Sequence, residues 1–348
     1  MTAVFDHPDF DAHEHVAFAH DHRTGMKALL AIHDSTLGPS AGGIRMRSYG
    51  CMGDAVADVL RLSRGMSYKN ALAGLKLGGG KAVLIGDPRT DKSPALMRAL
   101  GRAIQGLSGR YLAAEDVGMT LADMEDIALE TSHVFGRDPK AGFGGEPAPM
   151  TALGVLLSIK VTVRRVLGRD DLRGVVIAIQ GAGAVGADLA ELLAREGAHI
   201  IVADVNEARA VQTAQACGGQ VVSVDAILSA DADILAPCAL GAILNDATIP
   251  TIRAKIVCGA ANNQLELPRH GRALAERGIL YAPDYVVNAG GIINVAYEVG
   301  GNYDARAVQA HVGRIPATLE QVFEEAASEK LTPDVVADMM AQRAIGRG

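Results

Sequence analysis

The sequence contains no tryptophan, and tyrosine and phenylalanine bring the aromatic fraction to only 4%. With so few aromatic side chains, a surface that binds single-stranded nucleic acid by stacking its bases is not expected. Positive charge is also scarce, because 33 lysines and arginines face 40 aspartates and glutamates, which gives a formal net charge of −7. We therefore expect no nucleic-acid partner and no electrostatic binding to a membrane surface.

Cysteine is rare and scattered along the chain. The four cysteines, at positions 51, 217, 238 and 258, form no CxxC pair, so the sequence predicts neither a zinc site nor a disulfide framework, and no bound metal is expected. No apolar run approaches the roughly 18–20 residues of a membrane span, and the polar, acidic N-terminal stretch differs from a secretory signal. These absences favour a cytoplasmic protein with reduced thiols.

Apolar residues nevertheless make up 49% of the 348 residues, against 21% charged residues. This balance is typical of a folded globular protein, and at about 150 residues per domain the length predicts two domains. Glycine and proline concentrate at 136–149, where they predict a linker or mobile loop that forms part of a hinge.

Hydrophobic periodicity predicts an α/β unit before this linker. The expected elements are strands at 16–20 and 26–32, a glycine-rich loop at 38–43, a helix at 53–72, a glycine cluster at 78–80 that leads into a short strand, a helix at 93–107, a strand at 110–114 and a helix at 120–132.

A second α/β pattern follows the linker, after a long apolar helix at 151–167. Strands are expected at 175–179, 199–203, 220–222, 233–235, 255–257 and 279–281, with helices at 184–196, 206–217, 225–229 and 267–277 and a last helix at about 304–328. Such alternation predicts a parallel, doubly wound sheet. We expect two α/β domains with a cleft between them: a first domain with a mixed sheet, residues 1–138, onto which residues 325–348 pack back, and a Rossmann-like, doubly wound domain, residues 139–324.

A dinucleotide fingerprint opens the second pattern. Its GxGxxG residues follow a predicted strand and precede a predicted helix, and they are Gly181, Ala182, Gly183, Ala184, Val185 and Gly186. The glycines allow a tight turn, approach of the backbone to a pyrophosphate and close packing of helix on strand, and the helix N-terminus favours the phosphate charge. The alternative is a glycine-rich turn in a domain that binds no cofactor.

Asp204 lies 23 residues after Gly181, at the end of the next predicted strand. A carboxylate there can accept hydrogen bonds from the ribose hydroxyls and would repel a 2′-phosphate, so the cofactor is expected to be NAD rather than NADP. Arg209, which lies nearby in sequence, weakens this preference.

Two lysines adjoin glycine-rich segments in the first pattern. Lys81 follows three glycines, but it is not a Walker lysine, because Leu75 and Ala82 occupy positions that need glycine and a hydroxyl residue. A lysine that enters a buried strand beside a second lysine, Lys69, would have a lowered pKa and could act as a general base. Asp116, which follows another short strand, could exchange protons with it. The alternative is that these groups are ordinary solvated surface charges.

Several longer motifs, in order along nearly the whole chain, carry a family resemblance. They are GPSAGGIRM (38–46), MSYKNALAGLKLGGGK (66–81), AAEDVG (113–118), QGAGAVG (180–186), APCALGA (236–242), GAANNQL (259–265) and YAPDYVVNAGG (281–291). The sequence resembles the glutamate/leucine/phenylalanine/valine dehydrogenase family, most of all its leucine dehydrogenases, with some features of its phenylalanine dehydrogenases. The resemblance implies reversible oxidation of an L-amino acid, with NAD and water, to a 2-oxo acid, ammonium and NADH.

The resemblance also implies roles for individual residues. Lys69 would bind the substrate carboxylate together with backbone N–H groups of Gly42 and Gly43. Lys81 would activate water as general base, and Asp116 would transfer protons to and from the amino group.

The fingerprint and the resemblance together make residues 1–138 the expected substrate domain and residues 139–324 the expected NAD-binding domain. Further contacts with the cofactor are implied for the second of these. Asn262 would hold substrate and nicotinamide ribose, and Thr151 would contact the nicotinamide carboxamide. The remaining expected cofactor contacts are Cys238, Ala239 and Leu240, through their backbone, together with Val205 and Asn288.

Substrate choice is expected to follow from one position. Family members that act on glutamate have a lysine immediately before the glycine pair, where this sequence has Ala41. An unpaired second carboxylate would be costly to bury, so we expect an apolar substrate and an aliphatic wall completed by Ala114, Ile292 and Val295. A branched-chain preference is predicted, with a phenylalanine-type activity as the alternative because Ala41 is small.

Two other functional hypotheses stay open. One is a non-catalytic sensor of NAD or amino acids on the same scaffold, which would not need a general base. The other is a hydroxy-acid dehydrogenase, which usually relies on a histidine–carboxylate pair that the motifs do not provide. We expect a homodimer or a higher homo-oligomer.

Overall fold

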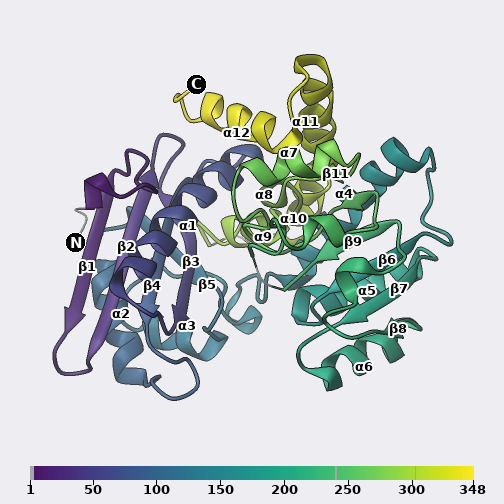
Figure 1. Cartoon of the computed structure of the whole chain (residues 1–348). Coiled ribbons are helices and arrows are strands. Elements are labelled where there is room, and N and C mark those ends of the chain that lie inside the picture. The colour runs from purple at the N-terminus through teal and green to yellow at the C-terminus, as the bar shows by residue number, and fades with distance from the viewer. Residues whose placement is uncertain (1–3, 240, 302) are drawn as a thin grey trace. The chain divides into compact units, whose positions relative to one another are not determined.

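The computed structural model describes residues 4–239, 241–301 and 303–348, and the chain divides into two compact units (Figure 1). The first unit comprises Met1–Glu146, Asn294–Ala305 and Ala341–Gly348, and the second comprises Pro147–Ile293 and Arg306–Met340. The chain therefore passes between the units four times.

These boundaries differ from the expected ones for reasons that packing explains. Residues 139–146 group with the first unit, where the Glu298 carboxylate accepts hydrogen bonds from the backbone N–H groups of Gly136 (2.6 Å) and Gly144 (2.8 Å). Of the expected C-terminal stretch 325–348, only Ala341–Gly348 belongs to the first unit. Helix α11 (Ile315–Glu329) lies in the second unit, where it packs on α4 (Ala148–Leu167).

The first unit contains a mixed five-stranded sheet. Its strands are β1 (His15–Asp21), β2 (Met26–Asp34), β3 (Ser40–Arg47), β4 (Gly78–Ile85) and β5 (Tyr111–Glu115), in the spatial order β1-β2-β4-β3-β5. The pairs β1–β2 and β2–β4 are antiparallel, whereas β3 runs parallel to both β4 and β5. The expected α/β class with a mixed sheet is confirmed.

Helices cover both faces of this sheet (Figure 1). Helix α1 (Met52–Leu72) packs on one face, where Val59 and Leu60 meet Leu29 of β2 and Val83 of β4. Helices α2 (Pro94–Gln105) and α3 (Leu121–Ala128) pack on the other face, against a core that includes Ile44, Met46 and Tyr111. Two short 3₁₀ turns, η1 (Val4–Asp6) and η2 (Pro139–Ala141), complete the elements described between residues 4 and 146.

Strand β3 corrects the expected glycine-rich loop at 38–43. Glycine has low strand propensity, so the sequence signal favoured a loop. In the structure Ser40–Arg47 is an interior strand between β4 and β5, and the cluster Gly78–Gly80 lies inside β4 rather than before it. The lack of side chains is a packing requirement here: a Cβ on Gly79 would lie 2.1 Å from the Ser67 nitrogen of α1.

The second unit contains a six-stranded parallel sheet, as the alternating pattern predicts. Its strands are β6 (Val176–Gln180), β7 (His199–Ala203), β8 (Gln220–Val221), β9 (Ile234–Pro237), β10 (Ile256–Val257) and β11 (Leu280–Tyr281), in the order β11-β10-β9-β6-β7-β8. The remaining elements before residue 297 are α5 (Ala184–Arg195), α6 (Glu207–Cys217), η3 (Ile227–Ser229), η4 (Ile249–Thr251), α7 (Arg269–Glu276), α8 (Asp284–Val287) and α9 (Gly290–Ala296). The expected helix at 225–229 is the 3₁₀ turn η3.

The last expected helix is two helices. Helix α10 (Ala305–Val312) ends before Gly313, and α11 begins at Ile315. Pro316, in the first turn of α11, lacks an N–H group and therefore suits the start of a helix rather than its interior. A further helix, α12 (Pro333–Ala344), follows.

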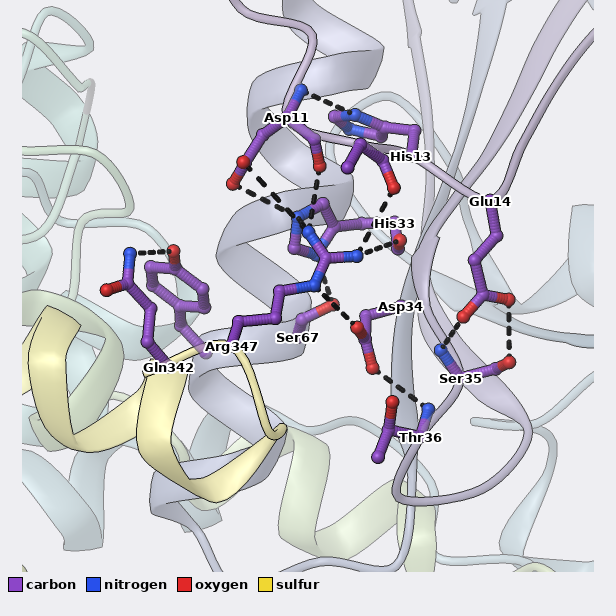
Figure 2. A network of polar contacts seen from close by, with 12 residues as sticks. Asp11, His13, Glu14, His33, Asp34, Ser35, Thr36, Ser67, Gln342 and Arg347 are labelled. Atoms are coloured by element: carbon purple, nitrogen blue, oxygen red, sulfur yellow. Dashed lines mark hydrogen bonds and ion pairs between the residues drawn. The ribbon is translucent and has the colours of Figure 1, made fainter.

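The C-terminal residues of the chain are anchored to the first unit by Arg347 (Figure 2). Its guanidinium donates to the backbone oxygens of Asp11 (2.9 Å), Ala12 (3.2 Å) and His33 (3.2 Å) and to the Asp34 carboxylate (2.8 Å). We call these residues, with Ser67, which hydrogen-bonds His33, the Arg347 clamp.

Within the described residues, no helix combines the length and apolar character needed to cross a bilayer. The same residues contain no group of three or more histidine, cysteine, aspartate or glutamate side chains that could hold a metal ion.

Candidate active site

Lys81 and Asp116 come together over strand β3 of the first sheet. Lys81 lies on β4 and Asp116 directly follows β5, so β3 separates their backbones. Their side chains meet above Gly43 of β3, with Lys81 Nζ 2.5 Å from Asp116 Oδ2. A Cβ on Gly43 would lie 2.5 Å from Asp116 Cβ and 3.2 Å from Lys81 Nζ. The glycine therefore leaves the space in which the lysine and the carboxylate make their ion pair.

Burial and charge decide the protonation of this pair. Lys81 is only 5% exposed, and burial lowers its pKa, with Arg45 acting in the same direction and Asp116 in the opposite one. Burial would raise the pKa of Asp116, but the positive charges of Lys81 and Arg45 outweigh it and lower that pKa to about 2. Asp116 is therefore a carboxylate at neutral pH, and Lys81 is an amine from which a proton is removed more easily than from a lysine in water.

The glycine pair of β3 has an irregular backbone. Strand β3 pairs with β4 up to Ala41 and again from Ile44. Tyr111 Oη lies 2.9 Å and 3.1 Å from the carbonyl oxygens of Gly42 and Gly43, to which it donates. Consecutive carbonyls of a regular strand point in opposite directions, so a single hydroxyl that reaches both marks a local distortion at the two glycines.

Lys69 lies in the last turn of α1 and is buried. Helix α1 packs on the face of the sheet to which Val83 points, and Lys81 precedes Val83 by two residues on the same strand. Because side chains alternate along a strand, Lys81 points to the same face. The two predicted lysines therefore belong to one side of the sheet.

Ala41 and Ala114 lie on the same face of the sheet as the lysine–aspartate pair. Ala41 pairs with Leu112 and Gly43 pairs with Ala114 in the parallel register of β3 and β5, which places Ala41 and Ala114 on one face. Both side chains are small, neutral and buried. Ile292 and Val295 are buried residues of α9, three apart and so on one side of that helix, and the division between the units falls between them.

The glycine fingerprint has the predicted strand–turn–helix form. Strand β6 ends at Gln180, Gly181 has a φ of +103°, and α5 begins at Ala184 and includes Val185. A Cβ on Gly186 would lie 2.0 Å from the Gly181 oxygen, whereas a Cβ on Gly183 would meet nothing within 4 Å. Gly186 is thus needed for the approach of helix to turn, and Gly183 faces open space.

Asp204 contacts the fingerprint directly. It follows β7, and its two oxygens accept hydrogen bonds from the backbone N–H groups of Ala182 and Asn206, both at 2.7 Å. The aspartate thus braces the glycine turn, a contact that the sequence did not reveal. Each oxygen keeps a second lone pair for another donor. Val205, the next residue, is 92% exposed.

The segment after β9 packs beside the same turn. Cys238 N donates to the Gln180 oxygen at 2.7 Å, and a Cβ on Gly181 would lie 2.8 Å from Ala239 Cβ. Burial raises the pKa of the Cys238 thiol to about 11, which leaves it a packing residue rather than a nucleophile. Leu240, the third residue predicted here, lies outside the described residues.

Two predicted asparagines of the second unit contact each other. Asn288 Nδ2 donates to Asn262 Oδ1 (2.9 Å) and to the Ala260 oxygen (3.0 Å). Asn288 Oδ1 is buried and has no hydrogen-bond partner within the described part of the chain. Thr151 Oγ1 donates to the Pro147 oxygen at 2.9 Å and lies next to Gly291, where a Cβ would be 2.6 Å away.

Two family models match the chain. One, described as the dimerisation domain of Glu/Leu/Phe/Val dehydrogenase, matches residues 13–133, and the other, described as Glutamate/Leucine/Phenylalanine/Valine dehydrogenase, matches residues 202–345. The chain belongs to this family.

Individual members of the family are similar over nearly the full length. A leucine dehydrogenase of Geobacillus stearothermophilus is 48% identical, across 98% of this chain and 93% of that protein. A phenylalanine dehydrogenase of Bacillus thermotolerans is 45% identical, across 96% and 88%. Among solved structures, L-tryptophan dehydrogenase from Nostoc punctiforme is 42% identical, with a TM-score of 0.79 and coverage of 96% of both chains.

As a Glu/Leu/Phe/Val dehydrogenase, the protein is an amino acid dehydrogenase with a nucleotide-binding domain, which implies a nicotinamide cofactor. The residues of the second unit fit such a group. The open side of Gly183 offers room for phosphates at the start of α5, and the free acceptor Asn288 Oδ1 offers a buried partner for a donor.

Sequence reasoning missed Arg45 in this dehydrogenase. Arg45 Nε lies 3.5 Å from Asp116 Oδ2, and Arg45 Nη1 lies 3.2 Å from Asp58 Oδ1 of α1. The motif GGIRM contains the necessary signal once 40–47 is recognised as a strand. The alternation of side chains then places Arg45 on the face of Gly43, where Lys81 and Asp116 meet.

Proposed function

We propose that the chain catalyses the reversible NAD-dependent oxidative deamination of an apolar, branched-chain L-amino acid. In the forward direction the amino acid, NAD⁺ and water give a 2-oxo acid, ammonium, NADH and a proton. The buried contact of Lys81 with Asp116 carries this proposal, because a lysine with a lowered pKa beside a carboxylate suits general-base chemistry near neutral pH.

Three charged residues of the first unit have separate roles in this proposal. Lys69 binds the substrate α-carboxylate, and the distorted backbone at Gly42 and Gly43 presents N–H groups to it. Lys81 removes a proton from the water that attacks the substrate carbon after its oxidation. Asp116, a carboxylate at neutral pH, passes protons to and from the nitrogen that leaves as ammonium.

The second unit holds the cofactor. The turn from Gly181 to Gly186 receives the pyrophosphate, and Asp204 accepts hydrogen bonds from the adenosine ribose, which favours NAD over NADP. Asn262, Asn288 and Thr151 orient the nicotinamide end. When bound, the nicotinamide accepts the hydride from the substrate Cα, and the protein contributes binding and orientation.

The residues at the substrate side chain support an apolar substrate. Ala41 and Ala114 offer no charge to a second carboxylate, and Ile292 and Val295 add aliphatic surface. Discrimination between neighbouring aliphatic side chains is worth only about 1–3 kcal/mol per methylene, so activity on several branched-chain substrates is expected. A phenylalanine-type activity is the second candidate, because two alanines leave room for a ring.

We also propose a cytoplasmic homodimer or larger homo-oligomer. The match to a dimerisation domain supports self-association. Strand β1 lies at an edge of its sheet and carries Phe18, whose side chain is 56% exposed. An edge strand with an exposed aromatic residue can pair with a second copy.

A substrate and cofactor panel tests the function. NADH formation would be followed with Leu, Val, Ile, Met, Phe and Glu, each with NAD⁺ and with NADP⁺. We expect the highest kcat/KM for a branched-chain amino acid with NAD⁺. Glutamate as the best substrate would refute the apolar pocket, and an equal rate with NADP⁺ would refute the role of Asp204.

A further inference from the structure

Asp116, the acidic partner of Lys81, lies close to a second cation, Arg45. Arg45 Nε lies 3.5 Å from Asp116 Oδ2, the same oxygen that Lys81 Nζ approaches to 2.5 Å. Arg45, Lys81 and Asp116 are all largely buried. Two cations thus share one carboxylate in a region shielded from water, where charge interactions are stronger than at the surface.

Arg45 is held in place by Asp58 as well as by Asp116. Its Nη1 lies 3.2 Å and 3.3 Å from the two carboxylate oxygens of Asp58 on α1, and Tyr49 Oη donates to Asp58 Oδ2 at 2.6 Å. Arg45 Nε is buried and makes no hydrogen bond within the described residues. Its attraction to Asp116 is therefore an ion pair set by the position of the guanidinium rather than by a directed bond.

We propose that Arg45 is a positioning residue of the catalytic pair: it keeps the negative charge on Asp116 and, by charge repulsion, eases the loss of a proton from Lys81. This inference rests on the proposed function, in which Lys81 acts as the general base. An arginine suits the task because it stays protonated throughout the working pH range.

The charges around the pair give the expected direction. Loss of Arg45 removes one positive charge from the surroundings of Lys81 and leaves the negative charges of Asp116 and Asp58 in place. The pKa of Lys81 should then rise, and less of the enzyme would carry a neutral base at neutral pH.

Other titratable groups near the pair must be separated from this effect. Helix α1, which packs on this face, contributes Asp58 and also carries Lys69, and β5 contributes Tyr111 and Glu115. Burial, together with Glu146 and Asp123, raises the pKa of Glu115 to about 7. A kinetic limb near neutral pH can therefore arise from Glu115 as well as from Lys81, so a direct observation of Lys81 is required.

The experiment follows Lys81 itself by NMR. The full chain would be labelled with ε-¹³C-lysine, the Lys81 signal assigned with Lys81→Met, and its shift titrated against pH in wild type and variants. For Arg45→Gln we expect the Lys81 midpoint to rise by about one pH unit, and the rising limb of kcat/KM to move by the same amount, a roughly tenfold loss at a pH below the limb.

Three further variants sharpen the test. Arg45→Lys keeps a positive charge and should restore most of the shift. Asp58→Asn removes a negative charge and should move the Lys81 midpoint in the opposite direction, to lower pH. Arg47→Gln, two residues along β3 with an exposed side chain over Tyr49, is the matched control and should leave the midpoint unchanged.

The outcomes are distinct. An unchanged Lys81 midpoint in folded Arg45→Gln overturns the inference, and so does an upward shift in Asp58→Asn should Arg45→Gln fail to fold. The NMR titration needs no turnover, so a shift without amino acid dehydrogenase activity in wild type would contradict the proposed function and leave the electrostatic role of Arg45 supported.

Discussion

Two clusters of charged side chains in the first unit are built in opposite ways. In the Arg347 clamp, one guanidinium contacts three backbone oxygens and the Asp34 carboxylate. In the lysine site, which we define as Lys81, Asp116 and Arg45, two cations share one carboxylate, and Arg45 Nε lacks a hydrogen bond within the described residues.

His33, the histidine of the clamp, also has a hydrogen-bond partner at each ring nitrogen. His33 Nε2 lies 3.1 Å from Arg347 Nη1 and 3.3 Å from Asp11 Oδ2. His33 Nδ1 lies 2.8 Å from Ser67 Oγ (Figure 2). Burial, with His13 and Arg347, lowers the pKa of His33 to about 4, so the ring is neutral at pH 7.

We expect the clamp to be a structural cluster and the lysine site to be a reactive one. Where every donor has an acceptor, a change of charge breaks bonds and costs stability. Where cations compete for one carboxylate, a proton can leave without the loss of several bonds. We therefore expect changes in the lysine site to affect turnover and changes in the clamp to affect the free energy of unfolding.

The largest expected effect is that of Lys81→Ala on turnover. Loss of the general base should lower kcat by about 10³-fold, while NADH binding, measured by fluorescence titration, should stay as in wild type. Lys27→Ala, which removes an exposed lysine of β2, is the control. Turnover near the wild-type rate in Lys81→Ala would remove Lys81 from the mechanism.

Gly43→Ala should come next. The new methyl group would lie 2.5 Å from Asp116 Cβ and 3.2 Å from Lys81 Nζ, so the ion pair must separate. We expect kcat/KM to fall by about 10²-fold, because displacement of catalytic groups by about 1 Å has effects of this size. Gly53→Ala, within α1 and without a close contact, should retain activity; equal losses in both variants would contradict the role of Gly43.

Arg347→Ala should lower stability rather than turnover, unlike Lys81→Ala and Gly43→Ala. It leaves the Asp34 carboxylate, which is buried, without its guanidinium, and we expect the free energy of unfolding to fall by about 2 kcal/mol in urea denaturation. Arg347→Lys should recover part of the loss, and Arg89→Ala, in an exposed ion pair with Asp87, should have no measurable effect. A kcat loss as large as that of Lys81→Ala, with stability unchanged, would abolish the distinction between the clusters.

The last expected effect concerns pH. His33 has a lowered pKa of about 4 in the folded state, so between pH 4 and its ordinary value near 6.5 the unfolded chain binds the extra proton. His33 should therefore destabilise the protein as pH falls through this window, by up to about 1.4 kcal/mol per pH unit. Glu115, with its raised pKa, acts in the opposite direction between about 4.5 and 7.

The measurement that isolates His33 compares wild type with His33→Gln. The difference in unfolding free energy between pH 7 and pH 5 should be smaller in the variant. The same difference in both proteins would show that His33 does not titrate in this window.

Much of the second unit was predictable from sequence. Alternating buried strands and amphipathic helices predicted the parallel sheet, and the glycine spacing predicted the turn between β6 and α5. In the first unit, Lys81 and Asp116 could be singled out as candidates because each lies in or directly after a short apolar strand. Strand β3 was not predicted, because glycine carries no strand signal. The requirement for glycine there arises only from the packing of neighbouring segments.

Sequence alone determined which residue types are available: a lysine after three glycines, an aspartate after a strand, and a glycine pair followed by Arg45. Tertiary structure decided that β3 lies between β4 and β5. As a result, Lys81 and Asp116 meet over Gly43, and Arg45 also lies close to the Asp116 carboxylate. The physical reason is that strand order and the direction of side chains depend on packing between segments far apart in the chain, and a charge acquires its chemistry from the groups that packing brings to it.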